Sequence, residues 1–293
     1  MVQNNITTTE TASMEDEWDV IITPSRSLFR LNLQEVWQYR DLLTLFVRRD
    51  FVALYKQTIL GPLWFFIQPI FTTLIFTVVF GNLAGISTDG IPPMLFYLAG
   101  ITLWNYFADT LKATSETFTK NQGIFGKVYF PRLVAPLSIT ITGLLKMGIQ
   151  LLLFIGIYIY FMAVGTPIKP SLYILLFPIL LLLLMGLGLG FGLIITSLTT
   201  KYRDLKFLIQ FGVQLAMYAT PVIYPLSEVP VKYQWLAILN PMTPIIETFK
   251  FSTLGRGTFD WMHLSYSIIF TIVLLLLGTL IFNKTEQNFM DTV

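Results

Sequence analysis

Six long apolar runs constrain this 293-residue chain more than any other feature of its sequence. Each run holds at least 20 residues, the length that a helix needs to cross a hydrocarbon core of about 30 Å. The runs lack the alternating pattern of barrel strands, so we predict an all-α polytopic membrane protein with six transmembrane helices. The predicted spans are Ile59–Phe80, Ile91–Leu111, Leu133–Ala163, Ser171–Leu198, Phe207–Leu226 and His263–Phe282.

Lysine and arginine residues gather in alternate connections between these runs. Fourteen of the 19 lie before the first run, in the second and fourth connections, and in the C-terminal tail. The first connection, Gly81–Gly90, holds none, and the third holds only Lys169. The positive-inside rule therefore predicts that both termini are cytoplasmic. We expect a polar, disordered tail at 1–27, a cytoplasmic amphipathic helix at 28–58, a transmembrane domain at 59–282 and a cytoplasmic tail at 283–293.

The composition excludes several classes of function. A net charge of +2 is too small to indicate a nucleic-acid partner, and a chain without cysteine has neither disulfides nor thiolate metal sites. One histidine and the lack of a G-x-x-x-x-G-K-[ST] motif argue against a metal centre or a bound nucleotide, so we expect no catalytic, cofactor-binding or metal-binding residues in this chain. Glycines at 186, 188, 190 and 192 resemble a glycine loop, but their apolar surroundings favour close helix packing.

Two cytoplasmic segments have patterns that suit a partner. Glu35–Thr58 places apolar residues on one helical face, which is typical of either a juxtamembrane anchor or a docking surface. Glu116–Phe125, in the second connection, predicts a short polar helix with a few exposed aromatic side chains. Such a helix would fit into a groove of a partner protein, and a plain solvated loop is the alternative interpretation.

Polar side chains recur at helical spacing inside four of the runs. Ser138, Thr142, Lys146 and Gln150 form one ridge, and shorter ridges pass through Gln68, Asn105–Asp109 and Gln210–Tyr218. These ridges either form interhelical hydrogen bonds or line a polar conduit. In a chain with 25 Phe, 13 Tyr and 6 Trp, such a conduit would suit carbohydrate. Asp109 and Lys146 are the only charged residues in the runs, which argues against an ion-coupled carrier.

The segment between the fifth and sixth runs contains two short apolar pieces, Val231–Leu239 and Thr243–Phe251. Neither is long enough to span as a helix, so we expect two half-helices that re-enter the outer leaflet, with an external cap domain as the alternative. Pro221 and Pro225 should break the end of the fifth run.

Six short motifs occur in order along the chain, and together they resemble the permease subunits of type-2 ABC exporters for polysaccharides. The family includes O-antigen, capsular-polysaccharide and teichoic-acid exporters, and the resemblance covers about Leu28 to Phe289. The motifs are Tyr39-Arg40-Asp41-Leu42-Leu43, Leu60-Gly61-Pro62-Leu63-Trp64, Lys127-Val128-Tyr129-Phe130-Pro131-Arg132, Tyr202-Arg203-Asp204-Leu205, Thr220-Pro221-Val222-Ile223-Tyr224-Pro225 and Asn240-Pro241-Met242-Thr243-Pro244.

This resemblance implies a half-transporter that forms a homodimer and recruits a separate nucleotide-binding ATPase, which holds the ATP and Mg²⁺. It implies that 116–125 is the coupling helix, that Val36–Ile59 is an interface helix, and that 231–251 is a re-entrant pair. The implied coupling residues are Glu116, Thr117, Phe118, Lys120, Asn121, Gln122 and Phe125. The implied interface and gate residues are Tyr39, Arg40, Arg48, Arg49, Tyr55 and Lys56. The expected pathway residues are Gln68, Trp104, Asn105, Asp109, Thr142, Lys146, Gln150, Gln214 and Tyr218.

The expected function is ATP-driven export of a lipid-linked polysaccharide, undecaprenyl-linked and O-antigen-like or capsule-like, across the bacterial inner membrane. A type-2 permease for a small lipid or a drug is one alternative. A membrane enzyme of glycolipid assembly is another, although it would need acidic or histidine clusters at the membrane face, where only isolated acidic residues are present.

Overall fold

The computed structural model describes residues 33–292 except residues 57 and 203, with side chains between 34 and 286. The predicted tail at 1–27, the start of the 28–58 segment and Arg203 lie outside the described residues. The described part of the chain contains helices and no strands, in agreement with the all-α prediction. The longer helices are α2 (Arg40–Tyr55), α3 (Trp64–Phe76), α4 (Pro93–Thr114), α6 (Val134–Ala163), α7 (Phe177–Thr199), α8 (Leu205–Ala219), α10 (Met242–Leu254) and α11 (Trp261–Thr292). The shorter ones are α1 (Leu33–Gln38), η1 (Gly61–Leu63), the π-helix η2 (Thr77–Leu83), α5 (Thr117–Phe125), η3 (Leu172–Leu176), η4 (Leu226–Glu228) and α9 (Val231–Leu239).

Four helical segments are long and apolar enough to cross a membrane. They are Gly61–Leu83, Val134–Ala163, Leu172–Thr199 and Trp261–Glu286, and they correspond to the first, third, fourth and sixth predicted runs. The second run is α4, whose 22 residues are mostly buried among the other helices. The fifth run is the 15-residue helix α8, which ends at Ala219 because Thr220, before Pro221, adopts an extended conformation.

The helix α7 lies between α4 and α11, and its four alternating glycines make both contacts close. Gly188 and Gly192 face α4, where added Cβ atoms would come within 2.9 Å and 2.5 Å of Thr110 and Thr114. Gly186 and Gly190 face α11 on the other side of the same helix. On α11, Gly278 approaches the backbone of α7 so closely that a Cβ would lie 2.8 Å from the Gly190 carbonyl oxygen. The expectation of close packing through small residues is confirmed.

The amphipathic segment before the first span is two helices rather than one. The chain breaks at Tyr39, between α1 and α2, and helix α2 ends at Tyr55 rather than at 58 or 59. Helix α2 packs against α6, and its Phe46 ring meets the Phe130 ring edge-on at 5.7 Å. A left-handed Gly61 (φ 54°), which only glycine adopts readily, then starts the turn into the first span.

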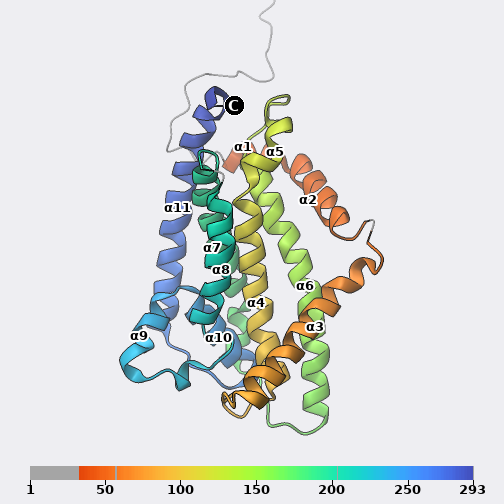
Figure 1. Cartoon of the computed structure of the whole chain (residues 1–293), viewed down its shortest axis with the longest axis vertical. Coiled ribbons are helices and arrows are strands. Elements are labelled where there is room, and N and C mark those ends of the chain that lie inside the picture. Colours follow the sequence, from red (N-terminus) through yellow and green to blue (C-terminus); the bar gives the residue numbers. More distant parts are fainter. Residues whose placement is uncertain (1–32, 57, 203, 293) are drawn as a thin grey trace, which may run out of the picture. The chain divides into compact units, whose positions relative to one another are not determined.

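The helix α5 and the C-terminal end of α11 lie at one end of this helical unit, and α9 and α10 lie at the other (Figure 1). At the α5 end, an aromatic cluster of Phe46, Phe118, Phe125, Phe130 and Phe282 joins three helices, α2, α5 and α11, and the α5–α6 connection. Within it, the Phe118 ring of α5 stacks on the Phe282 ring of α11 with centroids 4.7 Å apart.

The packing predicts that Gly278→Ala will destabilise the chain. The new methyl group would collide with the Gly190 carbonyl, a backbone atom that cannot rotate away, so α7 and α11 must separate. We expect a loss of roughly 1–3 kcal/mol, seen as a lower melting temperature by circular dichroism in detergent. The matched control is Gly148→Ala on α6, where a Cβ would meet nothing within 4 Å. Equal melting temperatures for the two variants would contradict this account.

Candidate functional site

The surface of α5 differs from the predicted helix with exposed aromatic side chains. Phe118 and Phe125 are buried, as are Thr117 and Asn121, so the expectation of exposed aromatic side chains on this helix is wrong. The outward face carries Thr119, Lys120, Gln122, Gly123 and Ile124. Alternation between the two faces follows the helical period, because the buried residues recur at spacings of three and four.

A salt bridge links the residue before α5 to the first turn of this helix. The Lys120 Nζ atom lies 2.7 Å from a Glu116 carboxylate oxygen, one turn earlier. Both side chains reach solvent, so this pair contributes little to stability and much to the charge pattern of the outward face. Of the predicted coupling residues, Glu116, Lys120 and Gln122 are therefore the ones that a partner can touch.

Helix α2 presents its basic residues to the outside. Arg40, Arg48 and Lys56 are exposed, whereas Tyr39 and Tyr55 are half-buried. Arg49 forms an ion pair with Asp50 at 2.8 Å, and its guanidinium group lies 4.4 Å from the centre of the Phe46 ring. The predicted interface residues thus form a polar, largely cationic outer face above an apolar inner face.

The two charged residues of the apolar runs form an ion pair with each other. Lys146 of α6 donates a hydrogen bond to the carboxylate of Asp109 on α4. Asp109 is the exposed residue of an otherwise covered helix, and Asn105, one turn away, is half-buried on the same side. The Asp109 carboxylate offsets the free-energy cost of placing a lysine inside a span. The sequence pattern alone did not reveal this pairing.

The predicted pathway residues divide by exposure. Trp104, Thr142 and Gln150 are buried within this chain and do not line an open surface of it. The remaining six are exposed or half-buried: Gln68, Asn105, Asp109, Lys146, Gln214 and Tyr218.

At the opposite end, two of the proline-containing motifs are hydrogen-bonded to each other. The Asn240 side chain accepts a hydrogen bond from the Met242 backbone N–H at 3.0 Å, which fixes the turn between α9 and α10. Its amide group donates to the Thr220 hydroxyl at 2.7 Å. The motif that begins at Asn240 is thereby fastened to the segment that follows α8.

A buried lysine strengthens the same junction. Lys250 of α10 donates to the Pro221 carbonyl oxygen at 2.7 Å, and its ammonium group lies 3.6 Å from the centre of the Phe96 ring on α4. Its partner Glu247, one turn earlier, is 3.8 Å away and accepts hydrogen bonds from the Thr258 backbone and hydroxyl. Glu247 and Lys250 interrupt the apolar piece Thr243–Phe251, and their spacing of three residues is a sequence signal for this ion pair.

Burial shifts the ionisation of both partners. It raises the pKa of the Glu247 carboxyl and lowers the pKa of the Lys250 ammonium to about 8, while their mutual attraction opposes both shifts. Burial therefore brings each group closer to its neutral form than it would be in water.

Comparison with known proteins places most of the chain in one family. The profile of the ABC-2 type transporter family matches residues 41–254. The chain is 27% identical over 252 residues to the O-antigen export system permease protein RfbA of Klebsiella pneumoniae, a match that covers 86% of this chain and 94% of that protein.

Two further relatives have related names. The O-antigen export system permease protein RfbA of Myxococcus xanthus is 26% identical over 266 residues, which covers 89% of this chain and 98% of that protein. The polysialic acid transport protein KpsM of Escherichia coli is 23% identical over 236 residues, which covers 80% and 89%.

A double-mutant cycle tests the ion pair between α4 and α6. Asp109→Asn leaves the Lys146 cation without its counter-charge, whereas Asp109→Asn with Lys146→Met removes both charges. We expect the single variant to melt at a lower temperature than the double one, with a coupling energy of about 1–2 kcal/mol, because the pair is only partly covered by protein. Lys146→Met alone completes the cycle, and additive effects would show that the two groups do not interact.

Proposed function

The chain belongs to the ABC-2 type transporter family, and on this premise we propose that it is the membrane permease of an ATP-driven polysaccharide exporter. The observation that carries the proposal is the near full-length similarity to O-antigen permeases from two organisms. The similarity to a polysialic acid transport protein widens the substrate class to capsule-like polymers. The carrier on which the glycan is built would be a membrane lipid such as undecaprenyl diphosphate.

The proposed topology has six spans with both termini in the cytoplasm of a bacterium. Four spans meet the criteria of length and hydropathy, and we assign the other two to α4 and α8. The protein surroundings of α4 support this, because a helix covered by other helices needs fewer apolar residues than one that faces lipid. The positive-inside rule then assigns the α5 end to the cytoplasm and the α9–α10 end to the outside.

We further propose that the chain acts as a homodimer. Helix α8 has a large unpartnered surface: Phe207, Leu208, Phe211 and Leu215 are exposed, and the Gly212 position is open. The polar side chains of Gln210, Gln214 and Tyr218 are exposed on the same helix. An apolar and amide-bearing surface of this kind is suited to a second copy or to a glycan between two copies.

The proposed energy source is a separate ATPase that docks at the α5 end and binds ATP and Mg²⁺. Its contact surface would be the outward face of α5, with Lys120, Gln122 and Ile124, next to the basic face of α2. The exposed polar residues on α3, α4, α6 and α8 would line the route of the glycan between the two copies.

Deletion of this gene in its host tests the proposed function. We expect the polysaccharide to disappear from the cell surface and its lipid-linked form to accumulate inside the cell, with recovery when the wild-type gene is returned. The measurement is glycan immunoblotting of intact and lysed cells. Normal surface display in the deletion strain would contradict polysaccharide export.

A steric variant tests the docking surface. Gly123→Trp adds bulk to the outward face of α5, at an exposed position where an added Cβ has no atom of this chain within 4 Å. We expect co-purification with the co-expressed ATPase to fall by about tenfold or more, equivalent to about 1.4 kcal/mol. Gly156→Trp, at an equally open and exposed position on α6 far from α5, is the matched control. Unchanged co-purification of the Gly123 variant would exclude α5 as the docking element.

A further inference from the structure

Two of the four candidate spans begin close together at the α9–α10 end of the chain. The span Leu172–Thr199 starts with η3, and the span Trp261–Glu286 starts with α11. The Tyr173 and Trp261 rings, from these two starts, have centroids 6.4 Å apart. The boundary between hydrocarbon and water must therefore pass near both rings.

Four aromatic rings form a cluster at this boundary. The Tyr173 ring lies 4.5 Å from the Phe259 ring, which stacks on Phe251 of α10 at 5.7 Å and meets Trp261 at 5.0 Å. Trp261 is 57% exposed, and Tyr173 also reaches the surface. Because tyrosine and tryptophan side chains favour the headgroup level of a bilayer, these four residues, the boundary cluster, mark that level on the protein.

Backbone contacts bring two basic residues together beside the boundary cluster. The Ser171 N–H donates a hydrogen bond to the Ser252 carbonyl oxygen at 2.9 Å. Gly255, in the left-handed conformation (φ 69°), lies so near Lys169 that a Cβ would come within 2.9 Å of the Lys169 carbonyl oxygen. Arg256 follows Gly255 directly, so the backbones of Lys169 and Arg256 adjoin although they belong to separate connections.

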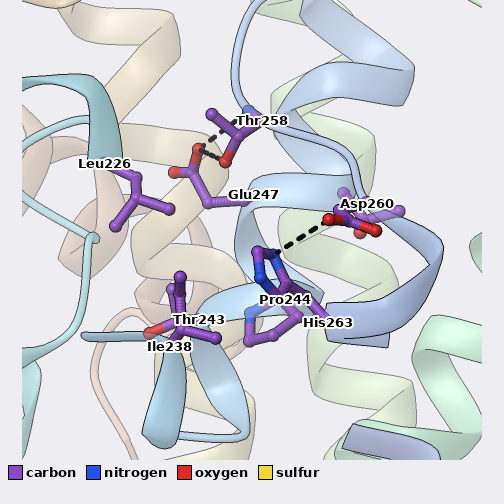
Figure 2. Close-up of a pocket in the computed structure, with 9 residues that line it drawn as sticks. Leu226, Ile238, Thr243, Pro244, Glu247, Thr258, Asp260 and His263 are labelled. Atoms are coloured by element: carbon purple, nitrogen blue, oxygen red, sulfur yellow. Dashed lines mark hydrogen bonds and ion pairs between the residues drawn. The ribbon is translucent and has the colours of Figure 1, made fainter. Parts of the chain in front are cut away.

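These two cations have no counter-charge in the described part of the chain. The Lys169 and Arg256 side chains are exposed, and neither forms an ion pair, hydrogen bond or ring contact with a described residue. Asp260, the acidic residue nearest to Arg256 in sequence, has other partners: one carboxylate oxygen accepts from the Met262 N–H at 2.8 Å, and the other lies 3.9 Å from His263 (Figure 2). At a bilayer surface, unpaired cations attract the phosphate groups of anionic lipids.

Apolar side chains extend from the boundary cluster into the two spans. Leu172 and Leu175 of η3 are 81% and 71% exposed, and Met262 of α11 is 78% exposed. The face thus presents cations, amphipathic rings and apolar side chains, which match the phosphate, the glycerol region and the acyl chains of a phospholipid. A free phosphate ion would match the cations alone, and a glycan offers no acyl chain to Leu172 and Leu175.

We propose that this face binds an anionic phospholipid from the leaflet at the α9–α10 end. The lipid phosphate lies at Lys169 and Arg256, the glycerol region lies against the rings of the boundary cluster, and the acyl chains follow Leu172 and Leu175. The inference goes beyond the proposed function, because it requires only that the two spans cross a bilayer and holds for any exported molecule.

Fluorescence quenching by brominated lipids tests this site in the full chain. The chain has no cysteine, so Met262→Cys supplies a single thiol beside the boundary cluster, to which a bimane fluorophore is attached. The labelled protein is placed in phosphatidylcholine nanodiscs that contain a minor fraction of chain-brominated phosphatidylglycerol or the same fraction of chain-brominated phosphatidylcholine. We expect quenching by phosphatidylglycerol to be about twofold stronger or more, since each lysine or arginine near the surface favours an anionic lipid by a factor of about five. Equal quenching by the two lipids would overturn the proposal.

Removal of the two charges locates the lipid. Lys169→Gln with Arg256→Gln changes only exposed side chains, and we expect the preference for phosphatidylglycerol to disappear. The matched control is Lys232→Gln, which removes an exposed cation from α9 outside the boundary cluster and should keep the preference. Arg256→Gln alone repeats the test with one substitution if the double variant does not fold, and it should reduce the preference. A preference that survives the loss of these charges would assign the lipid to another surface and refute the site.

Discussion

The close approach of α7 to α4 and α11 is the constraint on which the rest of the structure depends. Lipid is as apolar as the side chains that face it, so helices in a bilayer associate through van der Waals contact and short polar bonds rather than through hydrophobic burial. Glycines at alternate positions give α7 two close-packing faces, with Gly188 and Gly192 toward α4 and Gly186 and Gly190 toward α11. The three helices fix the frame against which α3, α6 and α10 pack.

Much of this fold was predictable from the apolar runs, because length and hydropathy report directly on the solvent that surrounds a helix. The helices found at each run and the short pair α9–α10 follow from that rule. The break at Tyr39 was not predictable, because the apolar spacing of α1 and α2 continues across it. Hydropathy also does not show which helices face lipid. Helix α4 is surrounded by protein rather than lipid, so its sequence can be more polar than that of a lipid-facing span.

The candidate sites were less predictable, because they depend on how helices rotate against one another. Spacing placed Asp109 and Lys146 on separate polar ridges, but their pairing requires that the two ridges face each other. Similarly, Phe118 and Phe125 looked exposed in a polar segment, and they are buried because the cluster below α5 has room for both rings. Periodicity defines the faces of one helix, whereas the partner of each face is set by tertiary packing.

The stack of Phe118 on Phe282 has a mechanical consequence. Rings already in van der Waals contact cannot be pushed closer together, so a displacement of α5 toward α11 must move the end of α11 as well. On the α2 side, the Phe130 ring contacts the Phe46 ring edge-on, which joins α2 to the same cluster. The aromatic cluster thus couples the position of the short helix α5 to the end of α11 and to α2.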